Sequence, residues 1–249
     1  MSGHSKWSTI KRKKGVTDAK RGALFTKLIK EITVAARTGG EDINANPRLR
    51  TAVLKAKASN MPNDNIDRAI KKGVGNVDGA VYEEIRYEGY GPGGVAIMVD
   101  CITDNKNRTT PEIRVIFSKN GGNLGESGSV NYLFERKGMF VIESGSTNED
   151  EVMEMLLDFD IEDIKTEDGN IVITTSPEGY IAVSDFFEKK KFNLLMNQLT
   201  YIPVTTVVLD ETKAAQCLKI MEQLEDQDDT QEVYSNYDIP DDIMVKLGE

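Results

Sequence analysis

The sequence has very few of the residues that bind metals or form disulfide bonds. Its 249 residues include one histidine, His4, and two cysteines, Cys101 and Cys217, which lie far apart in the chain. A zinc site made of histidine or cysteine needs several such ligands at short spacing, so this composition argues strongly against one. Two distant cysteines, one of them in an apolar segment, are typical of reduced, buried thiols in a cytosolic protein. We expect no metal and no cofactor.

Long apolar runs are also absent. No segment approaches the roughly 20 apolar residues that cross a bilayer. The basic N-terminus is not followed by the apolar segment of a secretory signal, and its lysine-rich start is a poor match to a mitochondrial transit peptide. Hydrophobic residues make up 39% of the chain and charged residues 29%. These features predict a soluble cytoplasmic protein that is long enough for two or three domains.

The two signs of charge are unevenly distributed. Residues 1–79 contain 17 Lys+Arg and 7 Asp+Glu, a net charge of +10, whereas residues 80–249 contain 14 and 34, a net charge of −20. The overall charge of −10 therefore conceals a strongly basic N-terminal third. Such asymmetry indicates a nucleic-acid-binding module attached to an acidic body.

The first 38 residues combine a dense basic segment with an amphipathic helix from Asp18 to Thr38. In the helix, apolar residues share one face and basic residues gather within roughly 100° on the other. The apolar residues are Leu24, Phe25, Leu28, Ile29, Ile32 and Ala35, and the basic ones are Lys20, Lys27, Lys30 and Arg37. Such a helix can pack on a bundle and offer its charge to a polyanion. A solvated helix face gives the same pattern, and membrane-surface binding is the weaker alternative because the apolar face looks committed to the bundle.

Residues 1–79 predict a bundle of three helices. The first ends at Gly39-Gly40, and the second starts after Asn46 as N-cap with Pro47 at its first position. The second helix has Leu49, Val53 and Ala56 on one side, and a third, with Ile66, Ala69 and Ile70, stops at Gly73. Residues 73–79 read as a linker.

From Tyr82 the pattern changes to strands, over 83–88 and 95–102. Between them, residues 89–94 satisfy the pattern G-x-G-x-x-G. A dinucleotide site needs a helix directly after this loop. Here a strand follows, and Pro92 lacks an N–H donor. We therefore predict a glycine-rich hairpin loop rather than a phosphate cradle.

A polar turn and a helix follow. Thr109 with Glu112 fits a capping box, or Thr110 caps the helix with Pro111 at its first position. The helix runs through Ile113, Ile116 and Phe117, a glycine-rich loop covers 121–128, and 130–134 resumes the sheet. Turn chemistry explains most of the Asp/Asn cluster over 103–107. Asn105, Asn107 and Arg108 are polar groups at a strand-to-helix turn, a usual place for ligand contacts.

The remaining pattern predicts an inserted domain. Residues 138–205 read as strand 139–143, helix 148–159, strand 161–166, strand 170–175, helix 178–190 and strand 193–201, the ferredoxin-like order βαββαβ. A strand over 204–209, a helix over 211–225 and a strand over 233–237 then complete the middle domain. The fold class is α+β multidomain, with a basic helical domain over 1–79, a middle α/β domain over 80–137 plus 206–249, and the insert over 138–205. The acidic run 225–229 reads as a solvated helix end.

Several segments carry a family resemblance: Gly3-His4-Ser5-Lys6-Trp7 with Ile10-Lys11, Asn60-Met61-Pro62, residues 87–94, Thr103-Asp104-Asn105 with Asn107-Arg108-Thr109, Gly128-Ser129-Val130 and Tyr234-Ser235-Asn236. Through them the chain resembles the YebC/PmpR family over almost its whole length. The resemblance implies three domains, the first helical and the other two α/β, and a cytoplasmic bacterial protein described as a probable transcriptional regulator that binds DNA. Relatives of this family, including a mitochondrial translational activator of cytochrome c oxidase, look like ribosome-associated translation factors, and some bacterial members help ribosomes through proline-rich stretches. The resemblance brings no set of catalytic residues.

Three hypotheses follow. The chain is a DNA-binding transcriptional regulator, although no helix-turn-helix is evident. Alternatively it is a translation factor that binds ribosomal RNA, with Trp7 and His4 stacking on unpaired bases, unless Trp7 only anchors the tail to the bundle. An enzyme is disfavoured, since no nucleophile motif appears. The predicted nucleic-acid-binding residues are His4, Lys6, Trp7, Lys11, Arg12, Lys13, Lys14, Lys20, Lys27, Lys30 and Arg37, with secondary contacts from Asn105, Asn107 and Arg108.

Overall fold

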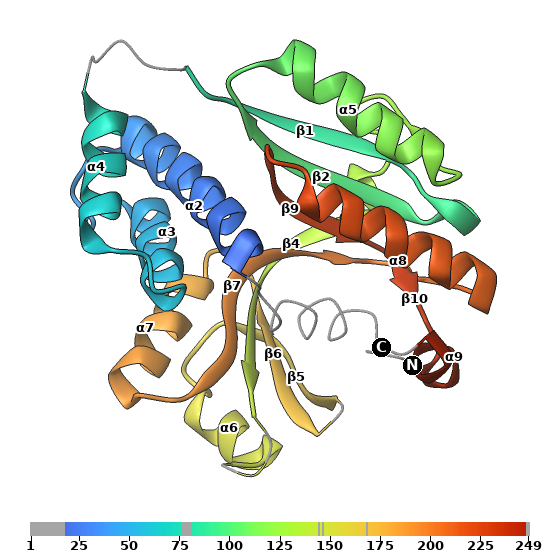
Figure 1. Cartoon of the computed structure of the whole chain (residues 1–249). Coiled ribbons are helices and arrows are strands. Elements are labelled where there is room, and N and C mark those ends of the chain that lie inside the picture. The colour runs from blue at the N-terminus through green and yellow to red at the C-terminus, as the bar shows by residue number, and fades with distance from the viewer. Residues whose placement is uncertain (1–17, 76–80, 144, 146, 168, 248–249) are drawn as a thin grey trace. The chain divides into compact units, whose positions relative to one another are not determined.

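A computed structural model describes residues 18–75, 81–143, 145, 147–167 and 169–247 (Figure 1). It confirms the predicted fold class, a mixed α+β protein in which helices come first and two sheet domains follow. The described residues fall into two compact units, one within 11–130 and 212–235 and the other within 131–211 and 236–249. Each unit is therefore made of stretches that are separated in the sequence by residues of the other unit.

Three helices open the first unit: α2 (Asp18–Gly39), α3 (Pro47–Ala58) and α4 (Asn63–Val74). The predicted start of α3 is confirmed, because the Asn46 side chain accepts a hydrogen bond from the Leu49 amide at 3.1 Å. The same side chain donates to the Ala35 carbonyl at 2.8 Å and so fixes α3 to the end of α2. One polar residue thus caps one helix and orients its neighbour.

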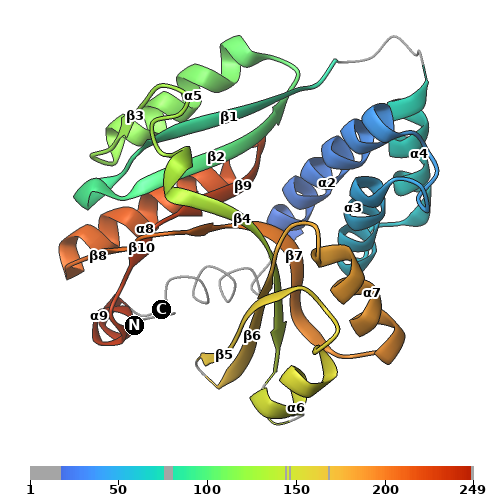
Figure 2. The same cartoon turned by 180° about the vertical axis from the view of Figure 1, so that it is seen from behind.

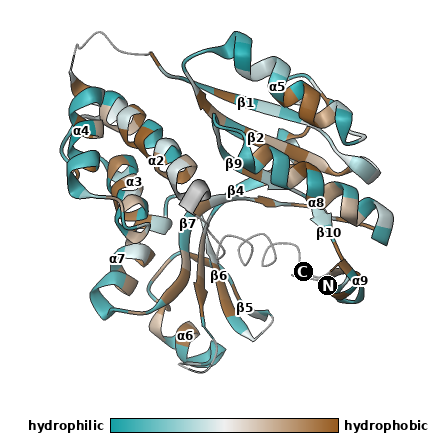
Figure 3. Cartoon of the chain, viewed as in Figure 1, coloured by the Kyte–Doolittle hydropathy of each residue, from teal (hydrophilic) through white to brown (hydrophobic). Residues whose placement is uncertain are grey.

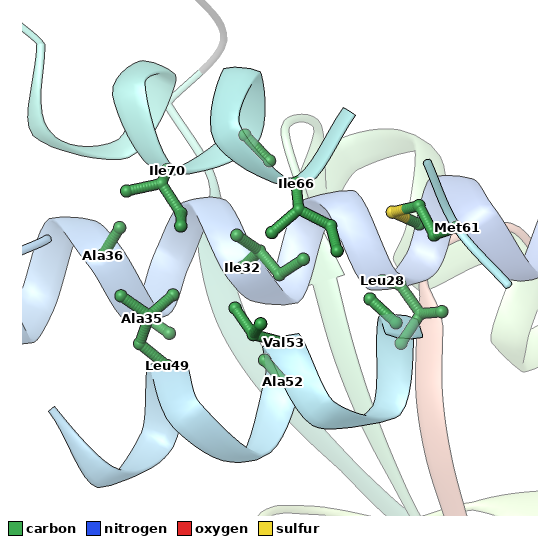
Figure 4. Close-up of a cluster of buried hydrophobic side chains, with 12 residues drawn as sticks. Leu28, Ile32, Ala35, Ala36, Leu49, Ala52, Val53, Met61, Ile66 and Ile70 are labelled. Atoms are coloured by element: carbon green, nitrogen blue, oxygen red, sulfur yellow. The ribbon is translucent and has the colours of Figure 1, made fainter. Parts of the chain in front are cut away.

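The core of this bundle lies between the three apolar faces (Figure 4). Ile32, Leu49 and Ala56 are fully buried there. Along α2, Leu28 lies near Met61 at the start of the α4 segment and Ala36 lies near Ile70, so α2 and α4 run in the same direction. The C-terminal ends of α2 and α4 therefore lie side by side.

The rest of the first unit is a four-stranded antiparallel sheet in the order β3-β1-β2-β9. Its strands are β1 (Glu83–Tyr90), β2 (Ala96–Thr103), β3 (Asn123–Leu124) and β9 (Thr230–Ser235). Helices α5 (Lys106–Lys119) and α8 (Glu211–Asp226) lie on the same face of this sheet (Figure 2). Strand β9 pairs with β2, so the sheet is completed by residues that come after 131–211 in the sequence.

The sequence predicted the wrong edge strand for this sheet. Residues 130–134 were expected to resume it, but the edge strand is β3, within the stretch that reads as a glycine-rich loop. The reason is the Glu88 carboxylate, which accepts hydrogen bonds from the amides of Gly128 and Val130, both at 2.8 Å. Val130 is therefore bound to a side chain instead of a neighbouring strand, and a 3-10 turn (Asn131–Leu133) follows.

The second unit contains a sheet in the order β5-β6-β4-β7. Its elements are β4 (Phe134–Ile142), α6 (Glu149–Met155), β5 (Ile161–Glu167), β6 (Asn170–Thr175), α7 (Tyr180–Lys190) and β7 (Leu194–Pro203), which is the predicted βαββαβ sequence. Phe140, Tyr180 and Phe187 pack in its core, with ring centroids of Phe140 and Tyr180 5.4 Å apart. Phe134 pairs with Pro203, so the chain enters and leaves this sheet on adjacent strands.

Smaller elements complete the second unit. Strands β8 (Val207–Val208) and β10 (Tyr237–Asp238) pair in parallel, and α9 (Asp241–Leu247) follows. The strand predicted over 233–237 is thus divided between β9 and β10, and the one predicted over 204–209 shrinks to two residues. In hydropathy (Figure 3), the apolar colour of this sheet lies mainly on β4 and β6, as expected for strands that pack against helices.

Candidate nucleic-acid interface

A buried carboxylate joins the helical bundle to the middle sheet within the first unit. Asp229 has no exposed surface. Its Oδ1 accepts from Lys30 Nζ at 2.7 Å, and its Oδ2 accepts from Arg108 Nη2 at 2.8 Å. The hydroxyls of Thr109 and Thr103 also donate to Oδ2, at 2.6 Å and 3.1 Å. Helix α2, strand β2, helix α5 and the turn before β9 therefore meet at one side chain.

The partners of Asp229 keep it ionised. Burial by itself would raise the pKa of this carboxyl, but hydrogen bonds from Arg108, Lys30 and Thr109 outweigh burial and hold the pKa well below its ordinary value. A buried ion pair stabilises a fold only when its remaining lone pairs are also satisfied. Here two hydroxyls supply those contacts, and removal of the Asp229 carboxylate would leave the buried Lys30 ammonium without its counter-ion.

Other cations of the bundle also face acidic groups. Lys27 Nζ donates to the carbonyl of Glu225, and burial lowers the pKa of this lysine. Lys55 pairs with Glu232 at 3.2 Å, and Arg48 binds Glu31 and Glu84 with N–O distances of 2.8 and 2.7 Å. Together with Lys30, these residues form what we call the docked cations. Acidic groups already neutralise much of their charge.

A second set of cations points away from these contacts. Five exposed residues of the bundle have no ion pair with a carboxylate among the residues that the structure describes: Arg37, Lys57, Arg68, Lys71 and Lys72. Lys72 lies over the ring of Tyr82, 5.4 Å from its centroid. The docked cations of the bundle are thus neutralised by acidic groups of the protein, whereas these five exposed cations are not.

The predicted site residues divide between these sets. His4, Lys6, Trp7, Lys11, Arg12, Lys13 and Lys14 lie outside the described residues, and Lys20 lies in α2. Arg37 is exposed, in agreement with the predicted cationic face. Lys30, in contrast, is only 8% exposed, and Lys27 is half-buried. The expectation of an exposed position is wrong for Lys30, because the helix face that carries it packs against the turn before β9.

The polar turn after β2 also has a structural role. Helix α5 begins at Lys106 with Asn105 as its N-cap, because the Asn105 side chain accepts from the Arg108 amide at 3.2 Å. The predicted caps Thr109 and Thr110 are therefore wrong, and Pro111 lies inside the helix. The hydroxyl of Thr109 is bound to Asp229 instead. Of the predicted secondary contacts, Arg108 lies at the Asp229 junction, Asn105 caps α5, and Asn107 is exposed.

The glycine-rich loops pack against each other. Only a 3-10 turn (Pro92–Gly94) lies between β1 and β2, so a strand and not an α-helix follows residues 89–94. A Cβ at Gly89 would lie 2.5 Å from the carbonyl of Asn123, and one at Gly122 would lie 2.7 Å from that of Tyr90. These glycines permit the close approach of two backbones. The G-x-G-x-x-G pattern is explained by this packing.

The open space beside Asp229 is small. A pocket of about 360 Å³ is lined by residues of α2 and α5 and by the acidic turn, among them Thr26, Arg108, Glu112 and Asp228. In the described part of the chain, no group of three or more metal-ligating side chains comes together. The helices that the structure describes include none long and apolar enough to cross a membrane.

Two features were missed from the sequence. Asp229 belongs to the acidic run that reads as a solvated helix end, and no local signal distinguishes it from Asp228. The cations of α4 were also not predicted, although a helical wheel of residues 63–74 places Arg68, Lys71 and Lys72 away from its apolar residues.

The fold and the charge arrangement define a class of protein: a cationic helical domain joined to two antiparallel sheet domains. Residues 5–76 match the family described as "TACO1/YebC protein N-terminal domain", and residues 82–237 match "TACO1/YebC second and third domain". The chain therefore belongs to the TACO1/YebC family.

Its relatives match along the whole chain. A protein of Syntrophus aciditrophicus named "Probable transcriptional regulatory protein" is 56% identical over 249 residues, which is 100% of both chains. A protein of the same name from Syntrophobacter fumaroxidans is 55% identical, also over 100% of both. The crystal structure of a conserved hypothetical protein from Aquifex aeolicus has 48% identity and a TM-score of 0.80, over 90% of this chain and 93% of that one.

Proposed function

We propose that this protein is a non-enzymatic regulator of gene expression that binds nucleic acid through its basic N-terminal third. The observation that carries the proposal is the separation of charge, with +10 on residues 1–79 and −20 on residues 80–249. Lysine and arginine bind nucleic acid by neutralising phosphates and releasing counterions. The names of the relatives, probable transcriptional regulatory proteins, support a regulatory role.

The arrangement of charge in the first unit supports the same proposal. Acidic groups pack against the docked cations, so a polyanion cannot reach Lys30 in this arrangement. The remaining cations of the bundle are exposed and are not neutralised by a described carboxylate. Because the acidic body repels a polyanion, binding is directed to the bundle and to the basic segment before it.

Two kinds of nucleic acid fit this charge pattern. The names of the relatives favour DNA as the target of a transcriptional regulator. Ribosomal RNA is the second candidate, because Lys11, Arg12, Lys13 and Lys14 lie in a glycine-flanked segment with Trp7 nearby. Such a segment suits phosphate contacts and base stacking in structured RNA better than it suits a base-reading helix in a major groove.

Competition at matched salt decides between the two candidates. Labelled duplex DNA, structured RNA and intact ribosomes would be titrated with the full chain over a range of salt concentrations. We expect affinity to fall steeply as salt rises. Preference for one DNA sequence that is lost on base substitution would identify a DNA regulator, and preference for ribosomes would identify a translation factor. Absence of salt-dependent binding to all three would refute the proposal.

Substitution of the basic segment tests the residues predicted there. Replacement of Lys11, Arg12, Lys13 and Lys14 by Ala should lower the salt slope by up to about 4. Replacement of Trp7 by Ala should weaken binding by about 1–3 kcal/mol if the ring stacks on a base. An unchanged affinity of the Trp7 variant would show that the ring is not in contact with nucleic acid.

A further inference from the structure

Helix α4 has a cationic face that the sequence analysis did not consider. Its buried residues are Ile66, Ala69, Ile70 and Gly73. At 100° per residue, Arg68, Lys71 and Lys72 fall within about 100° of one another and are centred almost opposite to the buried face. All three are exposed. The visible side of α4 is correspondingly hydrophilic in Figure 3.

The end of α2 packs against the buried face of α4, close to its last turn. Gly73 packs so closely on α2 that a Cβ there would lie 3.2 Å from the Arg37 amide nitrogen and 2.7 Å from the Ala36 Cβ. Because α2 and α4 run in the same direction, the last turns of both helices lie together (Figure 4). Arg37 lies in the last turn of α2, and Lys71 and Lys72 in the last turn of α4. Three cations from two helices therefore lie at one end of the bundle, and Arg68 lies about one turn before Lys71 and Lys72.

These cations differ from the docked cations in having no acidic partner among the described residues. Lys30 and Lys55 have acidic partners in the middle sheet domain, at 2.7 and 3.2 Å. Arg68 and Lys71 have none among the described residues and lie on the side of α4 away from its packing. The carboxylates of α4, Asp64 and Asp67, lie one turn before Arg68 and Lys71, so the last turn of α4 is its most cationic part.

We propose that Arg37, Arg68, Lys71 and Lys72 form a surface that binds the phosphate backbone of a double-stranded nucleic acid. The inference rests on the proposed function and deepens it, because it names the contact surface within the folded bundle. Long side chains at an exposed helix end can reach phosphates without a fixed geometry. Such contacts position a protein on a duplex but do not distinguish one base sequence from another. The surface accordingly takes DNA or RNA duplex through the same chemistry.

The same cations also lie where they stabilise helix termini. The C-terminal end of a helix carries partial negative charge, so Arg37, Lys71 and Lys72 are favourable there without any ligand. Arg68 is not in the last turn and gains little from this effect. The slope of affinity against salt separates the two roles, since a purely structural role would change thermal stability and leave the slope unchanged.

The experiment compares two variants of the full chain with equal net charge. The surface variant carries Arg68→Gln, Lys71→Gln and Lys72→Gln. The control variant removes three exposed lysines outside the bundle, through Lys119→Gln, Lys189→Gln and Lys219→Gln. Fluorescein-labelled duplex DNA and duplex RNA of equal length are the probes, from about 50 to about 200 mM salt.

We expect the surface variant to lose about three units of salt slope, one for each phosphate contact, and to bind about tenfold or more weakly. The control variant should keep the slope of the parent chain. Equal slopes for the surface and control variants, with the parent chain still binding, would overturn this inference and leave the proposed function in place. Failure of the parent chain to bind either duplex or ribosomes would overturn both.

Discussion

The ammonium of Lys30 lies 2.7 Å from the carboxylate of Asp229, and both side chains are buried. The two residues come from opposite ends of the chain, since Lys30 belongs to α2 and Asp229 precedes β9. Their contact fixes the helical bundle to the middle sheet domain. It also means that the bundle uses part of its positive charge for its own assembly.

Breaking this pair should be strongly destabilising. Lys30→Met leaves Asp229 without one of its two cations, and Asp229→Asn leaves Lys30 buried without a counter-ion. Each should lower the free energy of unfolding by about 3–5 kcal/mol, and the double variant should lose less than the sum. Urea unfolding of the four proteins gives the coupling energy. Glu211→Gln, in the exposed pair with Lys246, is the control and should change stability by less than about 1 kcal/mol. Additive losses for the two buried residues would contradict a direct interaction.

Acid should weaken the protein partly through Asp229. Its pKa is lowered in the folded state, so the unfolded chain takes up the proton first as the pH falls below about 4. The stabilisation is therefore present above that pH and is lost as the pH falls towards the folded-state pKa. The difference in unfolding free energy between the parent chain and Asp229→Asn should be largest near neutral pH and shrink below about pH 4. A difference that stays constant between these conditions would rule out Asp229 as an acid-sensitive group.

Replacement of two glycines of the bundle by alanine should change the stability of the protein in opposite directions. A Cβ at Gly73 would lie 2.5 Å from the Thr33 carbonyl, so Gly73→Ala must push α4 away from α2 and should destabilise by about 1–3 kcal/mol. A Cβ at Gly22 would meet nothing within 4 Å, and Gly22→Ala should stabilise helix α2 by about 0.5–1 kcal/mol. Thermal unfolding measures both. If both variants shift in the same direction, the close packing of α2 and α4 is wrong.

The insert predicted over 138–205 should be removable. The pairing of Phe134 with Pro203 places the ends of β4 and β7 together, and it suggests cuts at these two residues instead of at 138 and 205. We expect a chain with a short glycine-serine linker in place of the insert to unfold cooperatively, because both ends of the removed segment lie on adjacent strands. Circular dichroism during urea titration tests this expectation. Loss of a cooperative transition with several linker lengths would count against an independent insert.

Features set by neighbours in sequence were predictable. The N-cap at Asn46 with Pro47 and the order of elements from β4 to β7 depend on capping chemistry and hydrophobic periodicity, and the structure confirms them. Features set by distant residues were not predictable. Thr109 has the local sequence of a cap, yet its hydroxyl binds Asp229. Likewise, Val130 lies in an apolar run typical of a strand, but its amide binds Glu88.

The charged surface shows the same distinction. Composition and helical periodicity located the basic third of the chain. They could not show which lysines of α2 would meet carboxylates, because Lys30 and Arg37 share one helix face and differ only in what packs against them. The choice between docked and exposed cations depends on tertiary contacts with the turn before β9.

The return of β9 to β2 has a consequence for the order of events during synthesis. A ribosome makes the bundle first, yet strand β2 lacks β9, one of its two neighbours, and Lys30 lacks its counter-ion until residues 229–235 have emerged. Domains generally fold as they leave the ribosome, from the N-terminus onward. The sheet of the second unit, whose strands end at Pro203, can therefore form before the sheet of the first unit is complete. The ion pair of Lys30 with Asp229 is among the last contacts of the bundle to form, after that of Arg48 with Glu84 in β1.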